Sequence, residues 1–326
     1  MKINNKISNA KNAAKHSLSL LVLSFIAFLS SLVMAQEGSD IYIGKLNLLD
    51  KEAISDLKRI TENGQYTNQP YFFGHNTIFY TQALELPSAS DEPASVQMDI
   101  FEYNIDTELT RNFSNSSESE YSPTPLPNSK GMSVIRVNEQ GKQELWRLNE
   151  KGSAVEHLVP AIEPVGYQLW LNQHEMLLFV LGEPHTLQKV DIKQPESPGT
   201  VVDTNIGASL YRFKQSDWYL YSKAEDDSVD NAVKNSLKAY NHKSGTTLVV
   251  SDLPLTSQYF ALSPTGHVIS SDGKHIYQRQ LMLKDKQLQA VSEWQKVELE
   301  HDKCDSGVSR MNVASHSGLI ALVCPH

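Results

Sequence analysis

A short phrase, an acid followed by an apolar and an aromatic residue, opens a unit that recurs along this chain. "DIYIG" begins at Asp40 and "DIFEY" at Asp99, and each leads to a second short run, "LKRIT" or "LTRNF". Weaker copies of the phrase follow as "ELWRLNE", "TLQKVDI", "SLKAYNH" and "HIYQRQL". The first apolar residues of the six phrases are spaced by 59, 45, 42, 50 and 39 positions, and they are Ile41, Ile100, Leu145, Leu187, Leu237 and Ile276.

A second recurring hairpin lies between these pairs of runs. It reads "PYFFGHNTIFYT" from Pro70 and "FALSPTGHVISS" from Phe260, with related versions in the other units. Each copy is a β-rich run, a polar turn and another β-rich run. No unit carries a long apolar stripe of helical period. Four short strands in each of six units predict an all-β fold, a six-bladed β-propeller.

The phase of the repeat predicts how the ring closes. The chain starts with the third and fourth strands of a unit and ends with the first and second, Met311 to Val323. We therefore expect a closing blade built from both chain ends, with Met311–Val323 beside Asp40–Thr61. Such closure hides strand edges that an open sheet would expose. Because the fourth copy is weak, five or seven blades remain alternatives.

The combination of "DIY", the pattern L-x-R-x-T and a Pro-aromatic hairpin resembles the WD40-like repeat of TolB-type propellers. "FALSPTGHVISS" is similar to the Ser-Pro-Asp-Gly hairpin of that family, with Thr265 in the place of the Asp. The resemblance covers Asp40 to Val323. We expect no counterpart of the additional α/β domain of TolB, so functions of that domain are not implied. The resemblance implies a non-enzymatic scaffold for protein–protein contact in the bacterial cell envelope.

Residues 1–35 are predicted to be a signal peptide, and residues 36–326 a single propeller domain. Four lysines without an acid precede the apolar run Leu18–Leu29, and Val33-Met34-Ala35 suits cleavage after Ala35. The alternative is an uncleaved N-terminal anchor, but the run is short for a bilayer span. No later stretch is apolar enough to span a membrane. The prediction is an exported, periplasmic protein.

Charge narrows the classes of partner. The chain has 29 basic and 38 acidic residues, and four of the basic residues lie in the signal peptide, which leaves 25 against 38, or −13. This balance disfavours nucleic acids and anionic lipid surfaces as partners. It suits a basic partner, and the alternative is that the charge serves solubility alone. The predicted partner is an envelope or periplasmic protein.

Two cysteines, Cys304 and Cys324, flank the last hairpin and fall at the same end of it. In an oxidising compartment a structural disulfide is the natural interpretation. Redox and metal-binding roles are the alternatives. They are weaker, since there is no CxxC and no set of histidine partners.

Known catalytic phrases are missing from the sequence, which lacks GxSxG, HExxH, GxGxxG and GxxxxGK[ST]. We therefore predict no catalytic residue, no metal site and no cofactor. The alternatives are a propeller enzyme of lactonase or lyase type, or a small-ligand sensor, either of which would use the central channel. The inner strands supply aromatic residues and almost no carboxylates, which counts against catalysis; a sensor would have these aromatic residues lining the channel.

Two sets of polar residues are brought together by the repeat. Four histidines occupy equivalent turns on one face, where we expect them to stand too far apart to share a metal ion: His75, His174, His267 and His316. The loops of the opposite face are acidic and are a candidate docking surface for a basic partner. The predicted partner-binding residues are Asp91, Glu92, Glu118, Glu120, Glu225, Asp226, Asp227 and Asp230.

Overall fold

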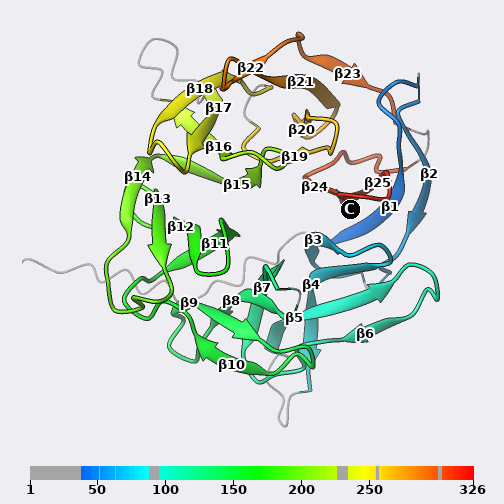
Figure 1. The fold of residues 1–326 in the computed structure, drawn as a ribbon. Helices are drawn as coiled ribbons and strands as arrows, with labels where there is room; N and C mark the ends of the chain where they lie inside the picture. The colour runs from blue at the N-terminus through cyan, green and yellow to red at the C-terminus, as the bar shows by residue number, and fades with distance from the viewer. Residues whose placement is uncertain are drawn as a thin grey trace, which may run out of the picture. The chain divides into compact units, whose positions relative to one another are not determined.

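The structure is a computed structural model that describes residues 38–50, 52–62, 64–87, 95–128, 130–225, 234–254, 257–299 and 303–326. Contacts divide the chain after Ala35, and the fold described here belongs to the part from Gln36 to His326. Within this part, the described strands form six antiparallel sheets arranged as the blades of a ring (Figure 1). The predicted fold, a six-bladed β-propeller, is confirmed.

Five blades are four-stranded antiparallel sheets, and the fifth blade has a fifth strand; in each, the strands follow one another from the centre of the ring outward. The innermost strands are β3 (Thr67–Phe73), β7 (Ser119–Pro125), β11 (Val165–Trp170), β15 (Ile206–Arg212), β19 (Phe260–Leu262) and β24 (Arg310–Val313). The second strands are β4 (Thr77–Leu86), β8 (Met132–Val137), β12 (Glu175–Val180), β16 (Trp218–Glu225), β20 (His267–Ser271) and β25 (Leu319–Pro325). The third strands are β5 (Ser95–Asn104), β9 (Gln143–Leu148), β13 (Thr186–Asp191), β17 (Lys234–Asn241), β21 (Ile276–Lys284) and β1 (Ser39–Leu46).

The outermost strands are short and mostly exposed. They are β6 (Thr110–Asn112), β10 (Ala154–His157), β14 (Thr200–Thr204), β18 (Thr247–Asp252), β22 (Gln287–Ala290) and β2 (Ile54–Arg59). The fifth blade departs from the predicted pattern, because the long strand β21 pairs first with β22 and then with β23 (Gln295–Val297). The run "WQKVEL", which begins at Trp294, supplies the second of these two short outer strands.

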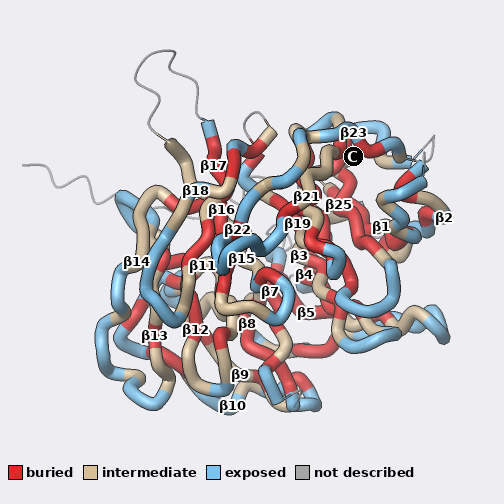
Figure 2. Tube along the Cα trace, turned by 45° about the horizontal axis from the view of Figure 1, so that its top comes forward, coloured by how far each residue is buried: buried red, intermediate tan, exposed pale blue. Residues whose placement is uncertain are grey.

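The repeated apolar residue marks the same place in every blade. All six of these residues lie on the third strand, and each is at most 3 % exposed. The middle strands are largely buried (Figure 2), because a blade packs against one neighbour on each face. Six hydrophobic clusters fill the six gaps between neighbouring blades.

Strand β25 shows how side-chain alternation serves two neighbours. Ile320 and Leu322 enter the cluster shared with the fifth blade, whereas Ala321 and Val323 enter the cluster shared with the first blade. Successive side chains on a strand point to opposite faces of the sheet. A strand that is covered on both faces therefore appears in the sequence as a continuous apolar run.

The closing blade is built from both ends of the chain, as predicted. Strand β1 pairs with β25 over seven residue pairs, from Ser39 opposite Pro325 to Lys45 opposite Leu319. In Figure 1 the blue β1 lies beside the red β25. The order across the sheet is β2-β1-β25-β24.

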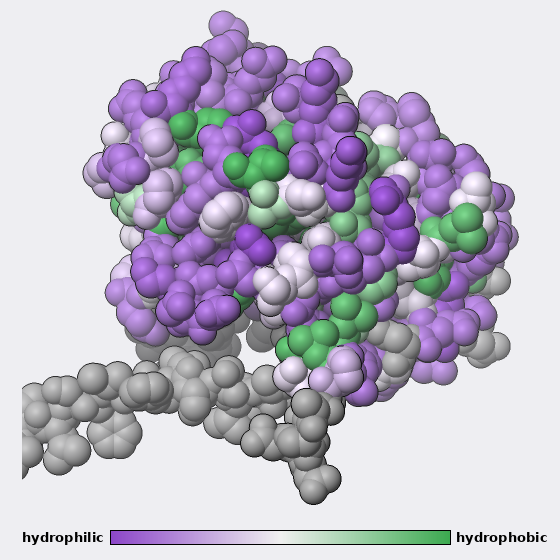
Figure 3. Space-filling view, turned by 90° about the horizontal axis from the view of Figure 1, so that it is seen from below, coloured by the Kyte–Doolittle hydropathy of each residue, from purple (hydrophilic) through white to green (hydrophobic). Residues whose placement is uncertain are grey.

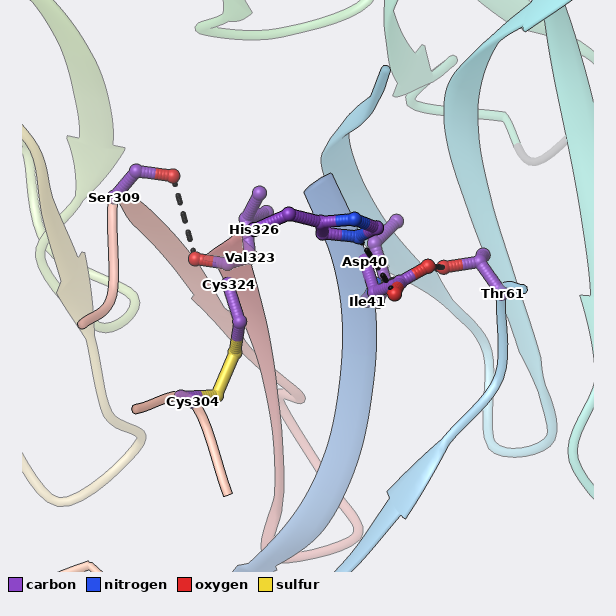
Figure 4. Close-up of a disulfide and its surroundings, with 8 residues drawn as sticks. All are labelled: Asp40, Ile41, Thr61, Cys304, Ser309, Val323, Cys324 and His326. Carbon is purple, nitrogen blue, oxygen red and sulfur yellow. Dashed lines mark hydrogen bonds and ion pairs between the residues drawn. A yellow bond between two sulfur atoms is a disulfide. The ribbon is translucent and has the colours of Figure 1, made fainter. Parts of the chain in front are cut away.

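Asp40, the acid that begins the first repeated phrase, stabilises this blade through side-chain hydrogen bonds (Figure 4). The carboxylate of Asp40 is buried and accepts a hydrogen bond of 3.0 Å from the hydroxyl of Thr61. The same hydroxyl oxygen accepts the backbone N–H of Ile41 at 2.8 Å. The ring Nε2 of the last residue, His326, lies 2.8 Å from the second oxygen of Asp40. The acid therefore connects the first and last strands of the chain.

The predicted disulfide is present, and it joins Cys304, which precedes β24, to Cys324 in β25 (Figure 4). Replacing both cysteines with serine is expected to lower the free energy of unfolding by about 3 kcal/mol, because the bond closes a loop of 20 residues. Urea unfolding of both proteins measures the difference. Two free thiols in the purified, unreduced wild-type protein would contradict the disulfide.

Candidate functional site: the central channel

The inner strands of all six blades line an open chamber of about 90 Å³ on the axis of the ring. Since a site of about 10–15 Å³ in this measure holds one water, the chamber has room for a small polar group. Each blade contributes at least one polar side chain to the lining. These side chains include Gln69, Ser122, Tyr167, Ser209, Tyr259 and Arg310.

Arg310 reaches across the chamber to the opposite blade. Its Nη2 donates a hydrogen bond of 2.8 Å to the hydroxyl of Tyr167 on β11. The guanidinium also stacks on aromatic faces, with its carbon 4.2 Å from the ring centroid of Tyr259 and 5.2 Å from that of Tyr167. Among the residues that the structure describes, Arg310 has no carboxylate as an ion-pair partner. A cation near the centre of the ring is thus held by aromatic rings and one phenol.

The charge of Arg310 changes the acidity of its neighbours. Burial would raise the pKa of Tyr167, but the adjacent guanidinium and its hydrogen bond hold that pKa below its usual value of 10.0. Burial raises the pKa of Tyr66 and of Tyr259, and Arg310 opposes this only in part. Tyr167 is therefore distinguished from the other tyrosines around this chamber.

An ultraviolet difference titration is expected to show one tyrosine that ionises below the ordinary pKa of 10.0. Tyr167→Phe should remove this first step, because Tyr167 is the phenol that Arg310 favours in its ionised form. Arg310→Met should instead move the step upward, since burial then acts without the opposing charge. A first step that is the same in all three proteins would contradict the assignment.

Irregularities in the inner strands shape the chamber. Four of these strands change register beside it, at Asn68–Tyr71, Tyr121–Thr124, Val165–Tyr167 and Ile206–Leu210. β-bulges of this kind redirect side chains and are common next to functional sites. The backbone also adopts positive φ at two lining residues, 56° at Gln69 and 54° at Ser122.

Hydrogen bonds between blades fix these irregular segments. The side-chain oxygen of Gln69 accepts the backbone N–H of Ser122 in the next blade at 2.8 Å. From the third blade, Nε2 of Gln168 donates to the carbonyl of Ser122 at 2.9 Å. The side-chain oxygen of Asn312 accepts the N–H of Phe72 at 3.2 Å, across the junction of the last and first blades. The chamber is therefore a rigid part of the fold.

A wider mouth of about 500 Å³ adjoins the chamber on the face that carries the turns between first and second strands. The two spaces share Tyr71, Tyr211, Leu210 and Asn312 as lining residues, and burial raises the pKa of Tyr71 to about 12. The mouth is both apolar and cationic. Its apolar lining includes Leu169, Leu262 and Val313, and its cationic or titratable lining comprises Arg212, Lys214 and His316.

None of the described residues that line the mouth or the chamber is an Asp or a Glu. Arg212 and Lys214 are exposed, and both belong to the end of β15 and the turn after it. In an acidic chain, this concentration of positive charge on the axis favours an anionic ligand or protein segment. The aromatic lining predicted for the channel is confirmed.

The histidine turns are closer together than predicted at one junction. The rings of His75 and His316, on neighbouring blades, have centroids 5.5 Å apart, so the expectation that such turns stand far apart is wrong for this pair. The ring closes with these two turns facing one another. Among the described residues, no group of three or more His, Cys, Asp or Glu side chains is placed to hold a metal ion.

The acidic residues predicted to bind a partner do not form one exposed set. Glu120 is completely buried at the start of β7, and the prediction that it contacts a partner is wrong. Its carboxylate accepts a hydrogen bond from Ser116 and lies 3.3 Å from Nε of Arg136. Glu118 is partly exposed and pairs with the same arginine at 2.5 Å. Glu225 accepts a hydrogen bond of 2.5 Å from Ser236.

The remaining residues of that prediction lie outside the described part of the chain. They are Asp91, Glu92, Asp226, Asp227 and Asp230. Their role in docking stays a prediction.

Burial raises the pKa of Glu120 to about 7, and the hydrogen bond from Ser116 opposes this only in part. A raised pKa means that the folded protein holds a proton that the unfolded chain, with a value near 4.5, has released. Stability should therefore fall as pH rises from about 4.5 to 7. Between pH 4 and 8 the wild-type protein should lose roughly 3 kcal/mol of its free energy of unfolding through Glu120. Glu120→Gln cannot lose a proton there, so its free energy of unfolding should rise by that amount relative to the wild type. Urea unfolding at the two pH values measures it, with the exposed Glu196→Gln as the control.

The sequence analysis does not identify Arg310, because this residue lies one position before the last repeated hairpin, which begins at Met311. Alignment of the last two hairpins, Phe260 on Met311, places it opposite Tyr259 of the preceding blade. The available signal was a basic residue at the position where the preceding unit carries Tyr259.

The outer surface of the described residues is mostly hydrophilic on the side that Figure 3 shows. Hydrophobic side chains form small, separated groups there. Isolated exposed apolar residues of this kind are normal on soluble proteins. None of the described residues forms a helix with the length and apolarity that crossing a membrane requires.

Comparison with known proteins finds propellers of similar structure but no protein of similar sequence. No family model matches the sequence, and no curated protein matches it either. A solved structure assigned as TolB from Agrobacterium tumefaciens aligns with a TM-score of 0.60 at 8% identity, covering 89% of this chain and 99% of that one. TolB from Acinetobacter baumannii aligns with a TM-score of 0.48 at 9% identity, covering 88% of this chain and 64% of that one.

An assigned 6-phosphogluconolactonase from Bacteroides uniformis has a TM-score of 0.42 at 10% identity, covering 81% of this chain and 98% of that one. At these identities the likeness concerns the fold. The chain has a TolB-like six-bladed propeller fold, and it spans 64% of the length of the Acinetobacter protein.

Proposed function

We propose that this chain is an exported, non-enzymatic binding propeller of the bacterial cell envelope, and that a protein partner docks at the mouth of its central channel. The observation that carries the proposal is the mouth itself, about 500 Å³ in volume and lined by apolar and cationic side chains. Charge complementarity at such a site favours an acidic segment of the partner.

The lining of the channel supports binding rather than catalysis. Tyrosines, amides and hydroxyls dominate the described part of the chamber, whereas general acid–base chemistry most often relies on histidine or carboxylates. The TolB-like fold supports a protein partner by analogy, which is a weaker reason than the site. The alternative of a lactonase-like or lyase-like enzyme rests on Tyr167, whose pKa is lowered beside Arg310.

Export to the periplasm is part of the proposal. It is supported by the composition of residues 1–35 and by the disulfide, which suits an oxidising compartment. The mass of the protein recovered from the envelope tests it directly. A chain that begins at Gln36 is expected, and a chain that retains residues 1–35 would indicate an anchor.

Capture of the partner tests the docking site. The tagged protein is crosslinked in its native envelope, and the captured proteins are identified by mass spectrometry. We expect a discrete envelope protein that is lost in the double variant Arg212→Glu, Lys214→Glu. The matched variant, with Asp226, Asp227 and Asp230 changed to lysine, should still capture it.

The reverse pattern would contradict docking at the mouth. Loss of the captured protein only in the lysine variant would favour a basic partner on the acidic loops, as the sequence predicts. Lactone hydrolysis or lyase activity in the purified protein, abolished by Tyr167→Phe, would favour the enzyme alternative.

A further inference from the structure

Arg310 is a charged group with unused hydrogen-bonding capacity near the centre of a protein. A guanidinium has five N–H donors. Arg310 donates one hydrogen bond to the hydroxyl of Tyr167, and Tyr259 also contacts the guanidinium. None of these described partners carries a negative side-chain charge. Charged groups removed from bulk water are costly unless they are paired and hydrogen-bonded. Because Arg310 lines a chamber, the missing counter-charge can be supplied by a ligand.

The surroundings of Arg310 are polar but carry no negative side chain in the described part of the chain. The phenol of Tyr167 and the hydroxyl of Ser209 lie on the lining. The hydroxyl of Ser209 accepts the N–H of Phe260 at 3.1 Å, which leaves its own hydrogen available to an acceptor. A ligand atom that enters the chamber therefore meets hydrogen-bond donors.

Size and charge select the chemical class of the ligand. The chamber, about 90 Å³, suits a planar group of a few atoms, and its single guanidinium offsets a single negative charge. A guanidinium binds a carboxylate through two parallel hydrogen bonds. A phosphate dianion would bring a second charge that no described lining residue of the chamber offsets.

We propose that the inner chamber is a binding site for one carboxylate group, held by Arg310, with the rest of the ligand extending past Tyr71 and Tyr211 into the mouth. This inference rests on the proposed use of the channel for binding and names the group recognised at its inner end. The carboxylate belongs either to a free small organic acid or to the C-terminus of a docked protein segment. Both present the same group to Arg310.

Calorimetric titration of the purified protein, produced from the full-length sequence, tests the proposal. The probes are acetate, the peptide Ala-Ala-Ala with a free C-terminus, the same peptide as its C-terminal amide, and inorganic phosphate at matched ionic strength. We expect a free carboxylate to bind at least tenfold more tightly than the amide or phosphate. Preference for acetate indicates a small acid, and preference for the free peptide indicates a C-terminus.

Variants locate the bound carboxylate. Arg310→Met should weaken the binding of the preferred carboxylate at least about 30-fold, because it removes the partly buried cation with which the carboxylate would pair. Arg310→Lys should retain part of the affinity, since it keeps the charge but loses the paired geometry. Arg111→Met is the matched control, at an exposed arginine on the outer strand β6, and should bind as the wild type does.

Two results would overturn the proposal. One is that free and amidated peptides, acetate and phosphate bind equally weakly to the wild-type protein, a comparison that requires no folded variant. The other is undiminished carboxylate binding by a folded Arg310→Met protein. Neither result affects partner capture at the mouth, which depends on Arg212 and Lys214, so failure of this inference and failure of the proposed function are distinguishable.

Discussion

A chain that ends at Gly318 is expected to lose cooperative folding altogether. The truncation removes β25, which is hydrogen-bonded to β24 on one side and to β1 on the other. It also removes Ile320, Leu322 and Val323, which are 0 % exposed. Burial of three such side chains contributes about 6 kcal/mol, comparable with the whole stability of many domains. Circular dichroism during heating should show no sharp transition.

A shorter truncation distinguishes the contribution of β25 to stability from the contribution of the residues after Cys324. A chain that ends at Cys324 keeps most of β25 and the disulfide, but loses His326 and its contact with Asp40. Arg59 still pairs with that carboxylate, so we expect a small loss of stability and an intact cooperative transition. Cooperative unfolding of the Gly318 chain at the wild-type temperature would contradict the role given to the closing blade.

Asp203→Asn is expected to lower the free energy of unfolding by about 3 to 5 kcal/mol at pH 7. The carboxylate of Asp203 lies 2.7 Å from Nζ of Lys223 and 2.5 Å from Nζ of Lys238, and it accepts a hydrogen bond of 2.6 Å from Tyr221. Both lysine side chains are at most 16% exposed. Without the carboxylate, two largely buried ammonium groups would face one another unpaired.

The pH dependence identifies the cause of this loss. Burial would raise the pKa of Asp203, but the two lysines hold it well below its ordinary value of 3.8. The stabilisation is therefore present above pH 3.8 and is lost as pH falls toward the lower, folded value. The difference between wild type and variant should shrink in acid.

Asp56→Asn is the matched control for Asp203, since its carboxylate pairs with Lys45 at the surface, where both side chains are more than 60% exposed. Exposed pairs of this kind contribute between about 0 and 1 kcal/mol. An Asp203→Asn protein that unfolds within about 1 kcal/mol of the wild type at pH 7 would contradict the account of this cluster.

The sequence predicts the blades well where the physical constraint repeats. Ile41, Ile100 and Leu145 recur because every third strand must bury the same position between two neighbouring blades. The closing blade follows from the phase of the repeat. The two short outer strands of the fifth blade could not be predicted, because an edge strand is exposed and little constrains its sequence.

The site depends on single residues, which a repeat does not reveal. Arg310 occurs in one unit, and its partner Tyr167 comes from the opposite blade, so only the closed ring brings the two together. Glu120 looked like a loop carboxylate because a run of polar residues surrounds it. Its burial depends on Arg136, which lies opposite it on the neighbouring strand. Long-range pairing of this kind is not visible in local composition.

Site-specific photo-crosslinking in the native envelope tests the central claim, that the mouth of the channel is where the protein binds its partner. A photoreactive residue is placed at Gln215, which lines the mouth, or at Val201, which is 55% exposed on the outer strand β14. The account predicts that one envelope protein is captured from position 215 and not from position 201. Capture from position 201 alone would contradict it.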